Sequence, residues 1–151
     1  MTRPRLELDR FLPYRLSVLS NLVSSAIAGV YSARFGLSIP EWRVMAVLAN
    51  EPQLAAAQVA ERTAMDKVAV SRAVSRLLER GHLERRMAPA DRRKSMLMLS
   101  AEGERIYAEV VPMALRYEQA LLEVLDADDR AALDRILKTL LGRARTFADL
   151  P

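Results

Sequence analysis

The 151-residue chain has the length of one domain, or of one domain with a dimerisation arm. Hydrophobic residues make up 51% of it, which is ample for a core, whereas the low contents of aromatic residues (5%) and Gly (5 residues) favour helices over a β-sandwich or barrel. The absence of Cys excludes disulfides and thiolate metal sites, and a single His leaves too few ligands for a zinc site, so neither a metal nor a cofactor is expected.

The net charge of +4 is unevenly distributed along the chain. Residues 62–94 hold ten cations and four anions, a net charge of +6, which leaves −2 for the remainder. A basic segment of this kind is typical of a protein that binds a polyanion, although a solvated basic face without a partner gives the same pattern.

The N-terminal part of the chain predicts an arm and one long helix. Residues 1–8 are expected to have little regular structure. From Phe11 to Ala33, apolar side chains recur at helical spacing, and Pro13 can occupy the first turn, where its missing N–H costs nothing. Gly36 is expected to end this helix.

Two shorter helices are expected next. Ser38 and Glu41 predict a capping box at the start of a helix over residues 40–49. A second helix is predicted over residues 54–62, although Ala55 stands where a capping hydroxyl is usual.

Residues 66–80 form the most informative segment. Asp66 is expected to cap a helix that Gly81 ends, and one face of this helix is apolar at the spacing i, i+3, i+4, i+7. The opposite face carries hydroxyls and cations, which are the side chains that reach phosphates and base edges. Its members are Lys67, Ser71, Arg72, Ser75 and also Glu79, with Arg76 on the flank. Together with the preceding short helix, this segment predicts a helix-turn-helix.

A β-hairpin is expected to follow. Residues 83–87 and 96–99 alternate as strands do, and a turn with Pro89 and Asp91 lies between them. The basic run from Arg92 to Lys94 would stand near the tip of this hairpin. Helix, hairpin and basic tip together describe a winged helix, in which the helix enters the major groove of DNA.

The C-terminal third predicts two more amphipathic helices. Ser100 is expected to cap the first, which contains Pro112, and the last is expected to start in the turn at residues 126–129. A small winged helix has no room to bury three long extra helices, so they are expected to pack on each other and on a second copy of the chain. The predicted fold class is mostly α with a small β-hairpin wing, with a winged helix-turn-helix over residues 37–100 and a helical dimerisation region formed by residues 1–36 and 101–151.

Several segments together carry a family pattern. They are Pro40-Glu41-Trp42-Arg43-Val44-Met45, Gln58-Val59-Ala60, residues 66–81, and the wing sequence Asp91-Arg92-Arg93-Lys94 followed by residues 97–103. With them the chain resembles the MarR family of bacterial transcriptional regulators over essentially its full length. The resemblance implies a homodimer of winged helices that binds a pseudo-palindromic operator, often as a repressor, and that often leaves it when a small aromatic or phenolic compound binds.

The resemblance also suggests roles for individual residues. Ser71 and Arg72 match positions that contact DNA, and Arg93 matches the wing arginine that enters the minor groove. Asp91 is interpreted as holding an arginine by a bidentate pair. The remaining cations are expected to contact phosphates: Lys67, Arg76, Arg86, Arg92 and Lys94. Arg80 is left out of this set, because it is expected to pair with Glu84 where the helix ends.

The resemblance also implies an effector site where the dimer helices meet the DNA-binding unit. Phe11, Tyr14 and Arg15 on the first helix and Trp42 on the next would suit a small aromatic carboxylate. The alternative, in which the rings belong to the core and Arg15 is a surface or dimer charge, remains open.

Two other DNA-binding functions fit the same sequence, whereas an enzymatic function does not. A nonspecific architectural DNA-binding protein and a repressor without an effector have the same sequence features. An enzyme is not expected, because the chain lacks a Gly-rich phosphate loop, Cys and a convincing nucleophile–base pair. No stretch approaches 18 consecutive apolar residues and no cleavable leader is present, which predicts a cytoplasmic protein without a membrane partner.

Overall fold

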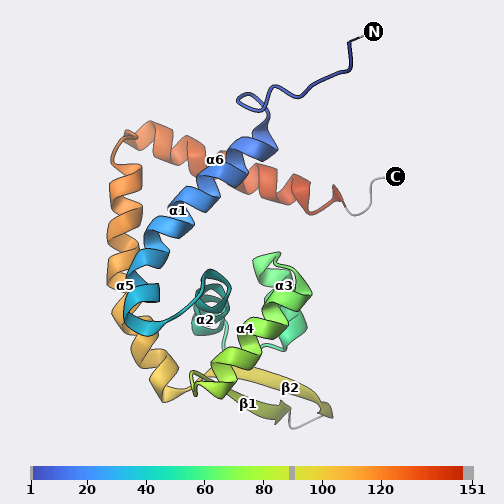
Figure 1. Cartoon of the computed structure of the whole chain (residues 1–151), viewed down its shortest axis with the longest axis vertical. Helices are drawn as coiled ribbons and strands as arrows, with labels where there is room; N and C mark the ends of the chain where they lie inside the picture. The colour runs from blue at the N-terminus through green and yellow to red at the C-terminus, as the bar shows by residue number, and fades with distance from the viewer. Residues whose placement is uncertain (1, 89–90, 148–151) are drawn as a thin grey trace. The chain divides into compact units, whose positions relative to one another are not determined.

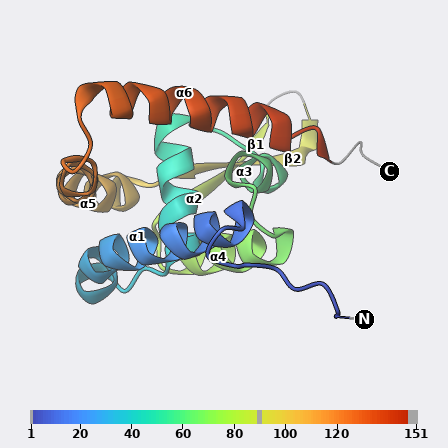
Figure 2. The same ribbon diagram turned by 90° about the horizontal axis from the view of Figure 1, so that it is seen from above.

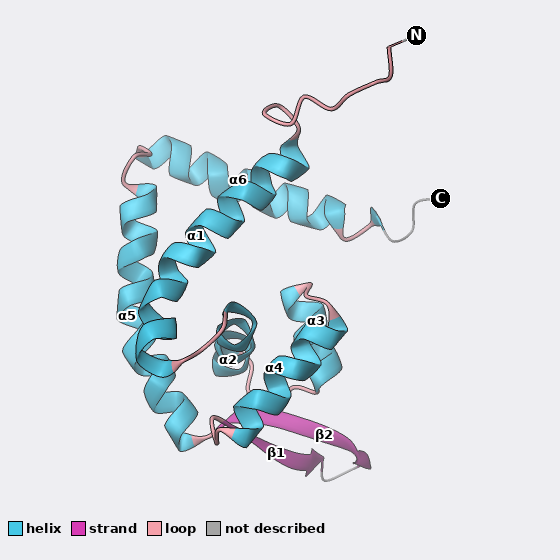
Figure 3. Ribbon diagram, in the orientation of Figure 1, coloured by secondary structure: helices cyan, strands magenta, loops and turns pink. Residues whose placement is uncertain are grey.

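The computed structural model describes residues 2–88 and 91–147, and for Ala88 and residues 91–94 it describes the backbone alone. Within these ranges the protein is mostly helical with one two-stranded antiparallel sheet (Figures 1 and 3), as the sequence predicts. The elements are α1 (Leu12–Phe35), α2 (Ile39–Asn50), α3 (Ala56–Thr63), α4 (Lys67–Glu79), β1 (Leu83–Ala88), β2 (Asp91–Leu99), α5 (Ala101–Leu122) and α6 (Ala127–Ala144).

The chain forms two compact units, residues 1–114 and 115–151. In the first unit α2 occupies the middle and contacts α1, α3, α4 and β2 (Figures 1 and 2). The second unit holds the end of α5 and all of α6, none of whose residues is buried.

The core of the first unit forms where α2, α3, α4 and the hairpin meet, and one end each of α1 and α5 contributes to it. Its most deeply buried side chains are Tyr31, Leu37, Val44, Met45, Leu48, Val59, Val70, Leu77, Leu97 and Val110. Helix α4 contributes its apolar face to this core, and its other face is exposed to solvent.

Helix ends follow the capping signals closely. Gly36 adopts a left-handed φ of 65° and its N–H bonds to Ser32 O, which ends α1. Asp66 caps α4 by accepting hydrogen bonds from the N–H groups of Val68 and Ala69, both at 3.1 Å. At α2, Ser38 Oγ accepts the N–H of Glu41 at 3.3 Å. Only this half of the predicted capping box forms, since the Glu41 carboxylate turns into the protein.

The start of α3 differs from the prediction. Leu54 is not helical but pairs with Leu97 in an isolated antiparallel bridge, with N–O distances of 3.3 and 2.8 Å. The helix begins at Ala56, and Gln58 Oε1 accepts the N–H of the N-cap residue Ala55 at 2.9 Å. This is the N3 half of a capping box, and the half that a hydroxyl at the N-cap would supply is absent. The bridge buries Leu54 and ties the helix-turn-helix to the hairpin.

The hairpin also differs in its extent. Strand β2 begins at Asp91, whose backbone pairs with Ala88, so residues 91–94 belong to a strand and not to the turn. The register then runs from Met87 opposite Ser95 to Leu83 opposite Leu99, with an irregularity at Met87 and Ala88. The basic run is thus held in an extended backbone close to the end of the hairpin.

Helix α1 is apolar over much of its length, yet Tyr31 is its only buried residue. By length and composition alone it could cross a membrane, with a mean hydropathy of 1.4 over its most apolar window. Counting consecutive apolar residues did not anticipate this, because four or more serines and Gly29 interrupt the apolar residues without lowering the mean hydropathy very far. Most of this apolar surface is exposed in a single copy of the chain.

Candidate nucleic-acid interface

One face of α4 is free of the rest of the protein and carries the polar residues picked out from the sequence. Lys67, Ser71, Arg72, Ser75 and Arg76 are all exposed. On the opposite side Val70, Ala73, Val74 and Leu77 are each at most 3% exposed. The predicted polarity of this helix is therefore present in the structure, and its cations and hydroxyls point to solvent.

An open groove runs beside this face, between α4 and the start of α2. It has a volume of about 270 Å³ and is lined by Ser38, Pro40, Glu41, Ala69, Arg72, Ala73 and Arg76. Two arginines on one wall make the groove attractive to an anion, but Glu41 lies on the other wall and opposes this. The groove thus places Arg72 and Arg76 together without forming an isolated anion site.

Glu41 is a functional candidate that the sequence did not reveal. Its side chain is only 4% exposed, and its carboxylate lies 4.0 Å from Arg76 Nη1 and 3.6 Å from Arg80 Nη1. Arg80 was predicted to pair with Glu84, and this was wrong. Arg80 lies near Glu41 instead, and Glu84 pairs with Arg86 at 3.9 Å. Glu41 was picked out only as a capping residue and as part of the family pattern, and neither indicated a buried carboxylate between two arginines.

The hairpin carries the second part of the predicted interface. Arg86 on β1 is exposed, as a phosphate-contacting residue must be. The side chains of Asp91, Arg92, Arg93 and Lys94 lie outside the described part of the structure, so their predicted roles stay predictions.

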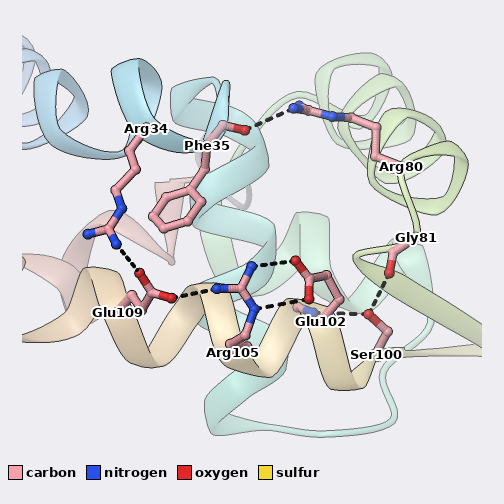
Figure 4. A network of polar contacts seen from close by, with 9 residues as sticks. Arg34, Phe35, Arg80, Gly81, Ser100, Glu102, Arg105 and Glu109 are labelled. Carbon is pink, nitrogen blue, oxygen red and sulfur yellow. Dashed lines mark hydrogen bonds and ion pairs between the residues drawn. The ribbon is translucent and has the colours of Figure 1, made fainter.

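The hairpin is joined to α4 where the end of α4, the start of β1 and the start of α5 meet (Figure 4). Ser100 caps α5 as predicted, by accepting the N–H of Gly103 at 3.0 Å, and its hydroxyl donates to Gly81 O at 2.6 Å. A Cβ atom on Gly103 would overlap the carbonyl oxygen of His82. The Ser-x-x-Gly sequence is thus required by a close approach of two backbones.

His82 lies in the same junction and is 8% exposed. Its Nδ1 atom is buried and makes no hydrogen bond with any described residue. Burial lowers the pKa of His82, the guanidinium of Arg80 acts in the same direction, and the Glu102 and Glu41 carboxylates oppose them. Arg105 also faces the ring and lowers the pKa slightly. The folded protein therefore favours the neutral imidazole.

This pKa shift predicts a pH-dependent stability. The unfolded chain binds a proton at His82 more readily than the folded protein does, so the contribution to stability should be complete above a pH of about 6.5 and decline below it. We expect urea unfolding of the wild type to show a falling free energy of unfolding between neutral and mildly acidic pH. His82→Gln should show a smaller fall, and an equal fall in both proteins would contradict the assignment.

The predicted effector residues do not all lie together. Tyr14 and Arg15 line an open hollow of about 320 Å³ on α1, with Asp9, Val18, Leu19 and Leu22. Phe11, 40% exposed, precedes the helix.

Trp42 instead stacks between Tyr31 and Tyr107, with ring centroids 5.3 and 5.5 Å apart. Tyr14 and Tyr31 are separated by roughly 25 Å along one helix, at about 1.5 Å per residue. Within one subunit Trp42 therefore does not share the hollow, and the two flanking tyrosines were not anticipated. Burial raises the pKa of the Tyr31 hydroxyl, which remains protonated at neutral pH.

A helix-turn-helix (α3 and α4) followed by an antiparallel hairpin defines a winged helix-turn-helix protein. The profile of the MarR family matches residues 35–94, which span this unit. Over this unit the chain is similar to the MarR family of transcriptional regulators, whose members are DNA-binding proteins and not enzymes.

Individual relatives agree with this assignment. The transcriptional regulator HosA from Escherichia coli O111:H- is 25% identical over 106 residues, which cover 70% of this chain and 78% of HosA. A MarR/EmrR family regulator from Acinetobacter sp. ADP1 superposes with a TM-score of 0.86 at 25% identity, covering 94% of this chain and all of the other.

Two solved structures with lower identity share the fold. A mutant of MarR from E. coli, complexed with operator DNA, has a TM-score of 0.76 at 22% identity and covers 91% of this chain and 99% of its own. BpsR from Bordetella bronchiseptica, whose DNA binding is regulated by 6-hydroxynicotinic acid, has a TM-score of 0.78 at 22% identity, with 91% and 97% covered.

Proposed function

We propose that this regulator is a dimeric repressor that binds a pseudo-palindromic operator and leaves it when a small aromatic or phenolic compound binds. The observation that carries the proposal is the exposed face of α4, where two hydroxyls and three cations stand opposite a buried apolar face. That face has the composition of a helix that reads the major groove. As a regulator of transcription the protein would act in the cytoplasm, where the bacterial chromosome lies.

The residues of this interface are assigned different tasks. Ser71 and Arg72, in the middle of the exposed face, read base edges, and Ser75 lies beside them. Lys67 and Arg76 contact phosphates. On the wing, Arg86, Arg92 and Lys94 supply charge along the backbone, Asp91 holds an arginine, and Arg93 enters the minor groove.

A gel-shift titration against the promoter beside its own gene tests this function. We expect a shifted complex at low salt that survives an excess of random-sequence competitor. No complex at low salt would contradict DNA binding by this chain. Equal competition by random DNA would favour the architectural binder over the operator-specific regulator.

The dimer is proposed because the helices outside the winged unit leave large apolar side chains in water. On α1 these include Leu12, Leu16, Leu19 and Leu22, and on α6 they include Ile136, Leu137, Leu140 and Leu141. A two-fold partner would cover such surface and would place two reading helices about one DNA turn apart. Burial of α1 in such a dimer would also explain why this helix is so apolar, with no need for a membrane.

The double substitution Leu19→Glu with Leu22→Glu should therefore yield a monomer. These side chains are 53% and 67% exposed in a single copy, so the change costs little within one subunit but buries two charges in a dimer. Light scattering after gel filtration measures the mass. Glu61→Lys, a charge change at an exposed position of α3, is the control and should remain dimeric. A wild type that is already monomeric would contradict the proposal.

The effector is proposed to be an aromatic acid bound near Arg15 and Tyr14. The hollow they line is open and belongs to one helix and the turn before it, so a partner subunit would have to close it. A cation beside an aromatic ring matches an aromatic carboxylate, the chemical class of the compound that regulates BpsR.

A thermal-shift screen of aromatic acids tests the effector. A binding compound should raise the melting temperature of the wild type and should raise that of Arg15→Gln less. The single Trp42 offers a second signal, because its stack with Tyr31 and Tyr107 makes its fluorescence sensitive to movement of α1, α2 and α5. The absence of any shift across the screen would favour a repressor without an effector.

A further inference from the structure

Arg80 lies at the end of α4, four residues after Arg76, and both arginines approach Glu41; unlike the other cations of α4, Arg80 is bonded to the end of α1. Its Nη2 donates to the carbonyl oxygen of Phe35 at 2.8 Å and its Nη1 donates to that of Gly36 at 3.0 Å. Figure 4 shows the side chain crossing from the end of α4 to the end of α1. Although Arg80 is one of the cations of the basic segment, both of its terminal nitrogens thus donate hydrogen bonds within the subunit.

The acceptors of Arg80 are carbonyl groups at the C-terminal end of a helix. These groups have no partner inside α1, and the dipole of the helix places partial negative charge there. Two parallel donors of one planar guanidinium bind the two carbonyls, which fixes the direction as well as the distance. The approach is tight, since a Cβ atom at Gly36 would lie 2.9 Å from Arg80 Nη2.

Buried charge holds Arg80 from a third direction. Glu41 Oε2 lies 3.6 Å from Nη1 of Arg80 and accepts no hydrogen bond from any described residue. A carboxylate this deeply buried is costly unless a cation compensates it. Arg80 therefore links three helices: α4, at whose end it lies, α1 through its last carbonyls, and α2 through Glu41.

The opposite side of the same helix end is also anchored. Arg34 Nη2 lies 2.7 Å from Glu109 on α5, and Glu109 and Glu102 both pair with Arg105 (Figure 4). The end of α1 is thus joined by charged groups to α5 on one side and to the reading helix on the other. Of these links, only Arg80 reaches α4 directly.

We propose that Arg80 is a positioning residue for DNA binding: its fork to the end of α1 sets the angle of α4 against the dimerisation helix, and so sets the half-site spacing that the dimer accepts. This inference rests on the dimeric, operator-binding function proposed above. In a two-fold dimer, the same rotation of α4 relative to α1 occurs in both subunits. The distance between the two copies of α4 therefore changes by the sum of the two displacements. Arg80 acts through this geometry and not through contact with a phosphate.

Arg80→Lys separates the two roles. Lysine keeps the positive charge and can still compensate Glu41, but a single ammonium cannot reproduce the planar fork to two carbonyls. Had Arg80 been a phosphate contact, lysine would replace it with little loss. Arg76→Lys, at an exposed cation of the same helix, is the matched control.

The experiment measures binding by fluorescence anisotropy to duplexes derived from a site that the wild-type protein selects from a random-sequence library. The series holds the selected spacing, the two spacings changed by one base pair, and an isolated half-site. For Arg80→Lys we expect about a tenfold loss of affinity at the selected spacing, equivalent to about 1.4 kcal/mol. We expect a much smaller loss at the half-site, a flatter preference among spacings, and an unchanged dependence of affinity on salt.

Arg76→Lys should keep the spacing preference of the wild type. The proposal is overturned if Arg80→Lys keeps it as well, or if it loses the same factor on the half-site as on the full site. If Arg80→Lys fails to fold, as judged by circular dichroism, the double variant Glu41→Gln with Arg80→Gln removes the buried charge together with its partner, and the same outcomes apply. A wild type that binds two half-sites no better than one would instead contradict the dimeric function itself.

Discussion

Replacing Arg72 by Ala should weaken operator binding by about 1–3 kcal/mol and relax the base preference at one position of each half-site. Arg72 is exposed in the middle of the free face of α4, and its fork of donors suits a bidentate contact with a guanine edge. Anisotropy titrations with the operator and with single-base variants of it measure both effects. Circular dichroism should be unchanged, because the substitution removes no buried atom.

Arg76→Gln is the informative comparison. As a phosphate contact, Arg76 should contribute evenly to all sequences, so its loss should weaken operator and random DNA by the same factor and reduce the slope of log affinity against log salt by about 1. The two assignments would be contradicted if Arg72→Ala weakened all sequences alike while Arg76→Gln changed the base preference.

Gly103→Ala should lower the free energy of unfolding by about 3 kcal/mol, with a fall of several degrees in the melting temperature. The new methyl group would meet the backbone carbonyl of His82, which cannot swing aside as a flexible side chain can. Making room would separate α5 from the turn between α4 and β1, where Ser100 holds both. Urea denaturation followed by circular dichroism measures the change.

Glu104→Gln is the control for this substitution, because it lies in the same helical turn with an exposed side chain. It should alter stability by no more than about 0.5 kcal/mol. A Gly103→Ala protein as stable as this control would show that the backbone approach at His82 does not constrain the residue.

Local signals predicted much of the fold. Asp66 and Ser100 cap the helices that follow them, as predicted. Asp126, in the turn that was expected to start the last helix, caps α6. Gly36 and Gly81 both take positive φ at helix ends. The polarity of α4 was also readable, because a helical period assigns each residue to a face before any partner is known.

These local signals did not predict contacts between residues that are far apart in the sequence. The bridge of Leu54 with Leu97 replaces the expected first residue of a helix, and nothing close to Leu54 in the sequence indicates its partner. Arg80 bonds to carbonyl groups 44 and 45 residues away, whereas the sequence offered nearby Glu84 as the simpler partner. Backbone carbonyls have no sequence signature, so a side chain that binds them cannot be recognised from composition or spacing.

The contacts among the aromatic residues were not predictable from the sequence either. Trp42 was grouped with Tyr14 and Arg15 because the resemblance implies a pocket between their helices, yet its neighbours are Tyr31 and Tyr107. Which rings meet depends on the angles between α1, α2 and α5, and these angles are set by packing that a single sequence does not specify.

Contact between the free face of α4 and DNA bases can be measured directly by a crosslink. The chain has no Cys, so Ser71→Cys introduces a unique thiol on that face, and Asp134→Cys introduces one at an exposed position of α6. Each variant is incubated with operator duplexes that carry a thiol-tethered base in the major groove. We predict a disulfide-linked complex from position 71 and none from position 134; a crosslink from 134 alone, or from neither while the complex forms, would contradict this contact.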